Sequence, residues 1–431
     1  MSESVHNLEI RVGQALWPPP SQYSSLLGDI SQKMPNIVEL KIETMDLSME
    51  ILEQDICRLI ASLTLLEKIT LPFYCLLPSI VSQLSHVKNL RNIEMGNNAL
   101  SYGRTGDVDD FHSILESSSF PSLKNLHFCS SLEDARTFLG GAYSPAFRLT
   151  SLWLRVTFPG MDTQHRTSPR CFRSLLELLA NACGPLERLE ITMSAPNDSD
   201  EDEMESLPRI TYSDFSCVAR FRSLKAFSIQ HVHPIEITDA DAETLASQCP
   251  RMEELTLNAY PTSIPQAEDL DFAATSLSVR SLASFATHCP HLKSLALYLY
   301  IDDDIRHIDS SAYSRFKSLE VLNFGYIHAP RLARQKDICS ILFSILPRGC
   351  ELRTYVTGQV DYDRIGVDRP SWGGRNYAAA EAAYAYWKSV EEVLNLMWRT
   401  KQEAERMSRS RIHELEGEVA LLKRELALAR T

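Results

Sequence analysis

The sequence brings histidine and cysteine together at two points, and such groups are the first candidates for metal binding or nucleophilic chemistry. His288, Cys289 and His291 fall within one short stretch, and His231 and His233 flank a single valine. Imidazole nitrogens and thiolates are preferred zinc ligands, and a cysteine beside a histidine can act as an activated nucleophile. The spacing matches no zinc motif, however, and Cys289 also belongs to a repeated structural pattern. We therefore expect no metal site and no catalytic residue here.

Motifs for other kinds of catalysis do not occur. The glycine pairs 140–141 and 373–374 lack the strand–loop–helix context that cradles a phosphate group, and neither GxSxG nor HExxH is present. The acidic run Asp302–Asp304 lacks the spaced ligands and the glycine of a calcium loop. We expect that the chain is not an enzyme and that it uses no cofactor.

A repeated apolar pattern determines the elements that position all of these residues. An apolar residue is followed three positions later by a second and two positions after that by a third, and the last two alternate as in a strand. Each copy therefore predicts one strand, and the copies cover residues 1–358. The clear copies begin at Ile37, Leu66, Leu90, Leu123, Leu149, Leu186, Leu224, Met252, Leu292 and Leu319, and two fainter copies begin at Val5 and Leu352.

The intervals between copies are long enough to contain a helix. Between Thr238 and Cys249 apolar residues recur at helical spacing, Thr238 and Asp241 resemble a capping box, and Pro250 ends the helix. Alternating strands and helices predict an α/β leucine-rich-repeat solenoid, with a parallel concave sheet and convex helices. A C-terminal helix or coiled coil follows it.

Cysteine occupies the same place in several repeats. Cys183, Cys249 and Cys289 each stand three positions before the first apolar residue of a strand. The pattern Cys-Pro-x-apolar-x-x-Leu-x-Leu, found from Cys249 and again from Cys289, resembles the repeats of the F-box/leucine-rich-repeat proteins common in fungi. The resemblance implies a receptor whose repeats bind a protein substrate and whose F-box docks the Skp adaptor of a cullin-based ubiquitin ligase. No F-box pattern precedes the first repeat, so Skp adaptor and cullin are expected partners only if an F-box exists outside this chain.

Alternate strand side chains should face the concave surface and form the binding site for that substrate. Aromatic and arginine residues, which are enriched in binding hot spots, gather there on the middle strands. We predict that five residues bind the partner: His127, Trp153, Arg155, Arg188 and Tyr298. The alternative is that an insertion folds over Trp153 and buries it.

Charge and cysteine content restrict the partners and the compartment. The chain has 43 basic and 56 acidic residues, a net charge of −13, which disfavours nucleic acid and anionic membrane as partners. Much of the acidic excess lies in an insertion near 196–206, which we expect to be a solvated loop. The ten cysteines are scattered and several occupy buried repeat positions. They favour a reducing compartment, the cytoplasm or the nucleus.

The C-terminal region has a different pattern from the repeats. Residues 359–378 read as a linker, and residues 379–431 contain helix-forming residues, no proline and a single glycine. Within 412–429, apolar residues alternate at intervals of three and four, which is typical of a coiled-coil seam. The predicted oligomerisation residues are Ile412, Leu415, Val419, Leu422 and Leu426, and the predicted partner there is a second copy in a homodimer.

Two functions are compatible with these features. In the first, the chain is a non-catalytic protein-interaction module that recognises a substrate, as in F-box ubiquitin-ligase receptors. In the second, it is a scaffold that oligomerises through its coiled coil and tethers partners through its repeats.

Overall fold

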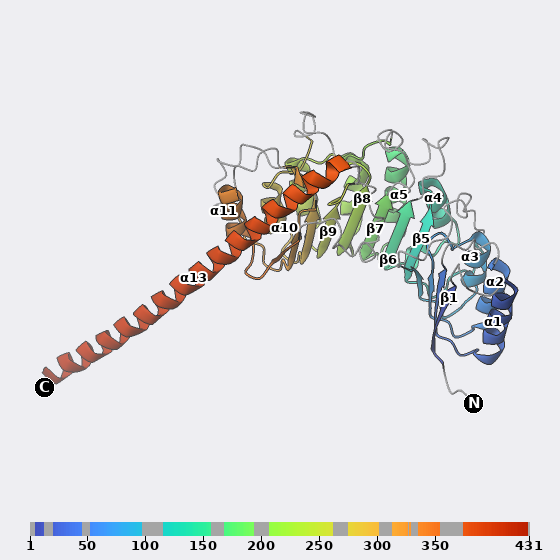
Figure 1. Cartoon of the computed structure of the whole chain (residues 1–431), viewed down its shortest axis with the longest axis horizontal. Helices are drawn as coiled ribbons and strands as arrows, with labels where there is room; N and C mark the ends of the chain where they lie inside the picture. The colour runs from blue at the N-terminus through green and yellow to red at the C-terminus, as the bar shows by residue number, and fades with distance from the viewer. Residues whose placement is uncertain are drawn as a thin grey trace.

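Each copy of the apolar pattern forms one strand, and the strands stack side by side. The computed structural model describes residues 5–12, 20–44, 52–96, 115–156, 168–193, 207–261, 275–300, 313–325, 327–328, 335–353 and 374–429. Within these residues twelve parallel strands form one unclosed sheet in chain order, with helices along its outer side (Figure 1). The fold is therefore an α/β, leucine-rich-repeat-like solenoid followed by a long helix, as the sequence predicted.

The strands of the large sheet are short and evenly distributed along the solenoid. They are β1 (Asn7–Val12), β2 (Glu39–Thr44), β3 (Lys68–Leu71), β4 (Asn92–Met95), β5 (Asn125–Ser130), β6 (Ser151–Val156), β7 (Arg188–Met193), β8 (Ala226–His231), β9 (Glu254–Leu257), β10 (Ser294–Leu297), β12 (Val321–Asn323) and β14 (Glu351–Arg353). A separate two-stranded sheet pairs β11 (Leu299–Tyr300) with β13 (Ile327–His328).

Helices cover the convex side between successive strands. They are α1 (Pro20–Lys33), α2 (Glu53–Ser62), α3 (Pro78–Ser85), α4 (Leu132–Gly140), α5 (Pro169–Ala182), α7 (Tyr212–Phe215), α8 (Asp239–Gln248), α10 (Ser281–His288) and α11 (Gln335–Ile345), with short 3₁₀ segments at Pro145–Arg148 and Ser216–Arg220. The C-terminal helix is α13 (Gly374–Ala429).

The middle apolar residue of each pattern forms a continuous row through the sheet, which is buried from β2 onward and half-buried at Leu8 in β1. Neighbouring strands align these residues directly, from Leu8 with Leu40 at one end to Leu322 with Leu352 at the other. A polar or misaligned residue in this row would lie in the core, so the row fixes the strand register. One prediction was wrong by three positions: Leu352 is the middle residue of β14 and not the first residue of its copy.

The caps and the cysteine positions follow the predicted scheme. Thr238 Oγ1 accepts a hydrogen bond from the Asp241 N–H at 3.2 Å, and the Asp241 carboxylate accepts one from the Thr238 N–H at 3.0 Å, which is the expected capping box. Cys183, Cys249 and Cys289 are the C-cap residues of α5, α8 and α10. Burial raises the pKa of these three thiols to about 12, 11 and 12, so they remain protonated.

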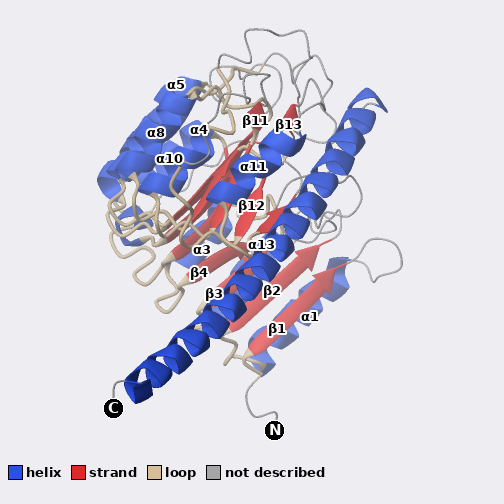
Figure 2. Ribbon diagram, turned by 90° about the vertical axis from the view of Figure 1, so that its left-hand side faces the viewer, coloured by secondary structure: helices blue, strands red, loops and turns tan. Residues whose placement is uncertain are grey.

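The first half of α13 belongs to the solenoid. Trp387, Val390 and Leu394 are buried in the main hydrophobic core, and the Trp387 ring stacks on Phe324 with ring centroids 4.4 Å apart. Figures 1 and 2 show α13 passing along α11 at the end of the sheet and then continuing away from the solenoid. The apolar residues of this half therefore cover the C-terminal end of the core, which a repeat protein must protect from water.

Some sequence predictions fall partly or wholly outside the described residues. The acidic insertion near 196–206 does so, as does most of the predicted linker 359–378. The helix begins at Gly374, inside the predicted linker and before the expected start at residue 379. Over the described ranges, no helix has both the length and the apolar content needed to cross a lipid bilayer.

Candidate interaction surfaces

One row of side chains on the concave face comes from the fifth position of each repeat pattern, between its second and third apolar residues. In the middle of the sheet this row runs from His127 through Trp153 and Glu190 to Ser228 and Thr256, each aligned with the next across neighbouring strands. The parallel register thus brings residues from β5 to β9 onto one surface. His127 and Trp153 lie side by side there, as the sequence predicted.

Trp153 is buried, although it lies on the concave side of the sheet. Its side chain is 7% exposed and packs in a small cluster with Phe73, Met95 and Cys129, apart from the main core. The Phe73 ring meets the Trp153 ring edge-on at 6.0 Å, and Trp153 Nε1 donates a hydrogen bond to Thr192 at 3.4 Å. Trp153 is thus buried, as in the alternative interpretation, but among the described residues its cover is the turn after β3 and not an insertion. Its role in binding a partner stays a prediction.

The described part of the cover over this cluster follows β3 directly. Tyr74, next to Phe73, has a φ of 62°, a left-handed conformation that is unusual for a bulky residue. The turn places the Phe73 ring over the Arg155 guanidinium at 4.8 Å, with the Tyr74 ring at 6.0 Å. Arg155 is 2% exposed, so it stabilises this cluster through cation–π contacts and is not available as a surface arginine.

His127 and Tyr298 are also largely withdrawn from solvent. The His127 ring meets Trp153 edge-on at 5.1 Å, and within the described residues its Nδ1 atom is buried without a hydrogen-bond partner. Burial lowers the His127 pKa to about 4, so the ring is neutral at physiological pH. Tyr298 is buried as well, and this burial raises its pKa above the ordinary value.

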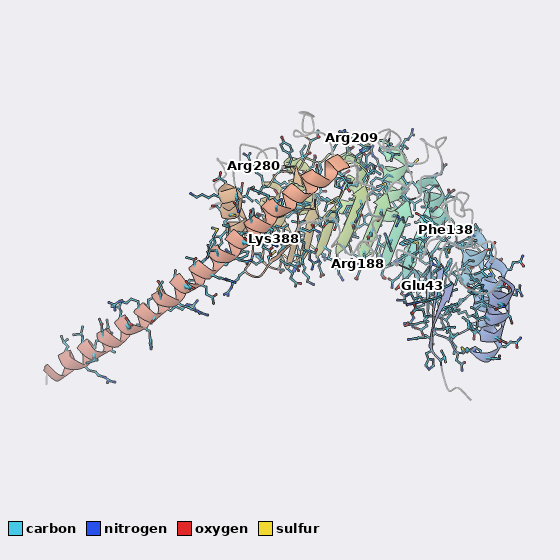
Figure 3. The ribbon with its side chains drawn as sticks, in the orientation of Figure 1. Glu43, Phe138, Arg188, Arg209, Arg280 and Lys388 are labelled. Carbon is cyan, nitrogen blue, oxygen red and sulfur yellow. The ribbon has the colours of Figure 1, made fainter. Side chains whose placement is uncertain are left out.

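Arg188 is the predicted residue that remains accessible. Its guanidinium donates two hydrogen bonds to the Glu254 carboxylate, at 2.7 and 2.9 Å, and both side chains are about half exposed. The pair spans two strands because Ala226, which lies between them on β8, is too small to block it. Figure 3 shows Arg188 on β7 at the margin of the sheet. Because both side chains are about half exposed, water screens the pair, and a charge on a partner could replace either member.

Glu190 is a concave-face residue that the sequence analysis did not select as a site candidate. It lies between Trp153 and Ser228 in the fifth-position row. Burial raises the Glu190 pKa to about 7, while Arg188 lowers it and Glu254 raises it further. From the sequence, a glutamate that alternates with polar Arg188 and Thr192 is expected to face solvent. Only the bulky Trp153 on the neighbouring strand indicated that this position is enclosed.

Replacing Glu190 by glutamine should make the stability less dependent on pH. In the folded protein the Glu190 carboxylate takes up its proton with a pKa of about 7, whereas in the unfolded chain its pKa is about 4.5. Its contribution to stability is therefore present below about pH 4.5 and is lost as the pH rises through about 7. Glu190→Gln should match the wild type at the acidic end and exceed it above neutrality, by at most about 3 kcal/mol. Urea unfolding across this range would measure the difference, and a gap independent of pH would contradict the expectation.

The predicted seam of α13 forms the second candidate surface. Its five apolar side chains are between 44% and 63% exposed: Ile412, Leu415, Val419, Leu422 and Leu426. Beyond the solenoid the side chains extend from a helix with no neighbouring element in the described part of the chain (Figure 3). Leu394 and Trp398, in the same seven-residue register, contact the core instead. The same seven-residue register thus docks the first half of α13 on the solenoid and leaves an exposed apolar seam on its second half.

No protein-family model matches the chain, and no curated protein matches it. Among solved structures, the chain is similar to the crystal structure of a Bacteroides fragilis protein determined as a structural-genomics target. The two chains are 12% identical, the similarity covers 80% of this chain and 75% of the other, and the TM-score is 0.36.

Proposed function

We propose that this chain is a non-catalytic protein-interaction module with two working surfaces. The solenoid binds a protein partner on its concave face, and the outer half of α13 joins the module to another chain. The observation that carries this proposal is the division of α13, whose first half is buried in the solenoid core while its second half exposes an apolar seam. An apolar stripe of this kind on an otherwise charged helix favours association with another helix.

The concave face supports the first part of the proposal through its exchangeable charges. In addition to Arg188 and Glu254, Lys68 pairs with Glu94 at 2.7 Å, and Lys41 pairs with Glu9 at 3.3 Å. Exposed pairs of this kind contribute little to folding. They are therefore suited to recognising a charged surface on a partner, while the buried residues His127, Trp153, Arg155 and Tyr298 support this face from beneath.

The nature of the partner follows from the resemblance of the repeats. We propose a protein substrate on the concave face, as in F-box ubiquitin-ligase receptors, with Skp adaptor and cullin recruited if an F-box exists outside this chain. The buried, protonated thiols support a cytoplasmic or nuclear location. The second candidate, an oligomeric scaffold that tethers partners, is favoured by the exposed seam of α13.

Affinity purification of the full chain should separate these functions. We expect the solenoid, in a version ending at Arg411, to retain its partners, and Arg188→Glu to reduce their recovery. Lys33→Glu is the matched control, because Lys33 is an exposed member of an ion pair on the convex helix α1. Skp adaptor and cullin among the retained proteins would support the ligase receptor. Equal recovery with both charge variants would contradict concave-face binding.

A further inference from the structure

The exposed half of α13 has the residue types of a two-stranded coiled coil. In the seven-residue register, Ile412 and Val419 occupy the first core position, and Leu415 and Leu422 the second. Leu426, the last residue of the seam, is at the next first position and lies beyond these four. β-branched residues at the first position combined with leucine at the second favour two parallel strands over three or four. All four side chains are exposed. The geometry of the seam therefore indicates one partner helix.

The charged residues beside the seam indicate which helix that is. Arg411 and Glu418 precede the first core positions, and Glu416 and Lys423 follow the second. In a parallel, in-register pair of identical helices, each preceding residue faces the following residue five positions further along the other copy. Arg411 would then face Glu416, and Glu418 would face Lys423. Both contacts join opposite charges, and symmetry makes each of them occur twice.

The opposite orientation is disfavoured by the same residues. If the four core residues faced one another in antiparallel order, Glu416 would lie against Glu416 of the other copy and Glu418 against Glu418. Like charges at these flanking positions select against an arrangement. In the single chain Arg411 instead pairs with Glu414 on its own helix at 2.9 Å, an exposed contact that is easily exchanged.

The attachment of α13 to the solenoid disfavours pairing within one chain. Trp387, Val390 and Leu394 hold the first half of the helix in the core, and α13 is continuous from Gly374 to Ala429. From Glu403 onward every side chain that the structure describes on α13 is exposed. For the seam to reach its own solenoid, the helix would have to break, with loss of backbone hydrogen bonds.

We propose that α13 forms a parallel, in-register, two-stranded coiled coil with a second copy of this chain through Ile412, Leu415, Val419 and Leu422. The proposal names the chain to which the outer half of α13 joins the module. It rests on that part of the proposed function alone. Binding of a protein by the solenoid is independent of it and is tested separately by the version ending at Arg411.

A charge exchange between two variants tests the proposal on the full chain. Glu418→Lys places lysine opposite Lys423, and Lys423→Glu places glutamate opposite Glu418, so each variant alone should dimerise roughly tenfold or more weakly than the wild type. An equimolar mixture should dimerise again, because each new charge meets its opposite on the other variant. Sedimentation over a range of concentrations measures the dimerisation of the wild type, of each variant and of the mixture. A monomeric wild type, or variants that dimerise as well alone as when mixed, would overturn the proposal.

A disulfide tests the orientation and register. Val419→Cys should link two chains under oxidising conditions, because only the parallel, in-register arrangement brings identical core positions within bonding distance. Arg424→Cys is the matched control on the outer face of the same helix, where Arg424 is exposed, and it should remain unlinked. If the Val419→Cys variant dimerises but forms no interchain disulfide, the parallel, in-register arrangement is wrong.

Discussion

Replacing Trp387 by alanine is expected to lower the free energy of unfolding by about 3–5 kcal/mol, the usual range for a fully buried tryptophan. Trp387 is 2% exposed, stacks on Phe324 and meets Tyr386 edge-on at 5.5 Å. Removing the indole would leave a cavity at the end of the core and loosen the helix that covers it. Chemical denaturation followed by circular dichroism measures the effect.

Leu396→Ala is the control for this experiment. Leu396 lies on the same helix, nine residues after Trp387, but is 63% exposed. Its replacement should change the stability by no more than about 0.5 kcal/mol. If both variants had the same small effect, α13 would not be docked on the solenoid, and its first half would not act as a cap.

Trp153→Ala should also lower the stability strongly, by about 3 kcal/mol, since Trp153 is the largest side chain in the concave cluster. The substitution would leave a cavity in the cluster. It would also remove the edge-on contacts with Phe73 and His127 and the hydrogen bond to Thr192. Thermal or urea unfolding together with a partner-binding assay would separate a packing role from a recognition role.

Arg188→Ala provides the comparison on the same face. Arg188 is exposed and its bond to Glu254 should contribute less than about 1 kcal/mol. We therefore expect Trp153→Ala to affect stability and Arg188→Ala to affect binding. Full stability of Trp153→Ala with loss of binding would mean that the cluster opens to receive a partner and that Trp153 is an anchor after all.

The strands were predictable because their pattern is dictated by burial. Leucine, isoleucine or phenylalanine stands at the middle position of every repeat, since that row is buried along the sheet from β2 to β14 and half-buried at Leu8 in β1. The capping box at Thr238 and the cysteine positions were predictable for a similar reason: each satisfies a local requirement of a helix end that can be read within a few residues.

The concave face was less predictable because its contacts join residues distant in sequence. Phe73 and Tyr74 reach Arg155 and Trp153 only because Tyr74 adopts a left-handed conformation, which no propensity for tyrosine suggests. The pair of Arg188 with Glu254 depends on the small residue between them in space. Strand alternation identified the residues on this face, but not which of them cover the others.

The apolar period of α13 posed a different difficulty. The same spacing of three and four residues serves both a helix docked on a core and a helix paired with another helix, so Leu394 and Trp398 could not be distinguished from Ile412 and Leu415 by period alone. The change to charged residues after Trp398 marks where the apolar docking ends; Lys401 over Phe343 and Gln402 bonded to Arg348 continue the contact with the solenoid for one further turn.

The unbroken course of α13 has a consequence for valency. A helix rises about 1.5 Å per residue, so the stretch from Trp398 to Ile412, where the proposed pairing begins, is a stiff spacer of roughly 20 Å. Two solenoids joined through the tips of such spacers would present their concave faces at a fixed separation and a fixed mutual angle. A target with two copies of the recognised surface at a matching distance would gain avidity from both, whereas a target with a single copy would bind with the affinity of one face.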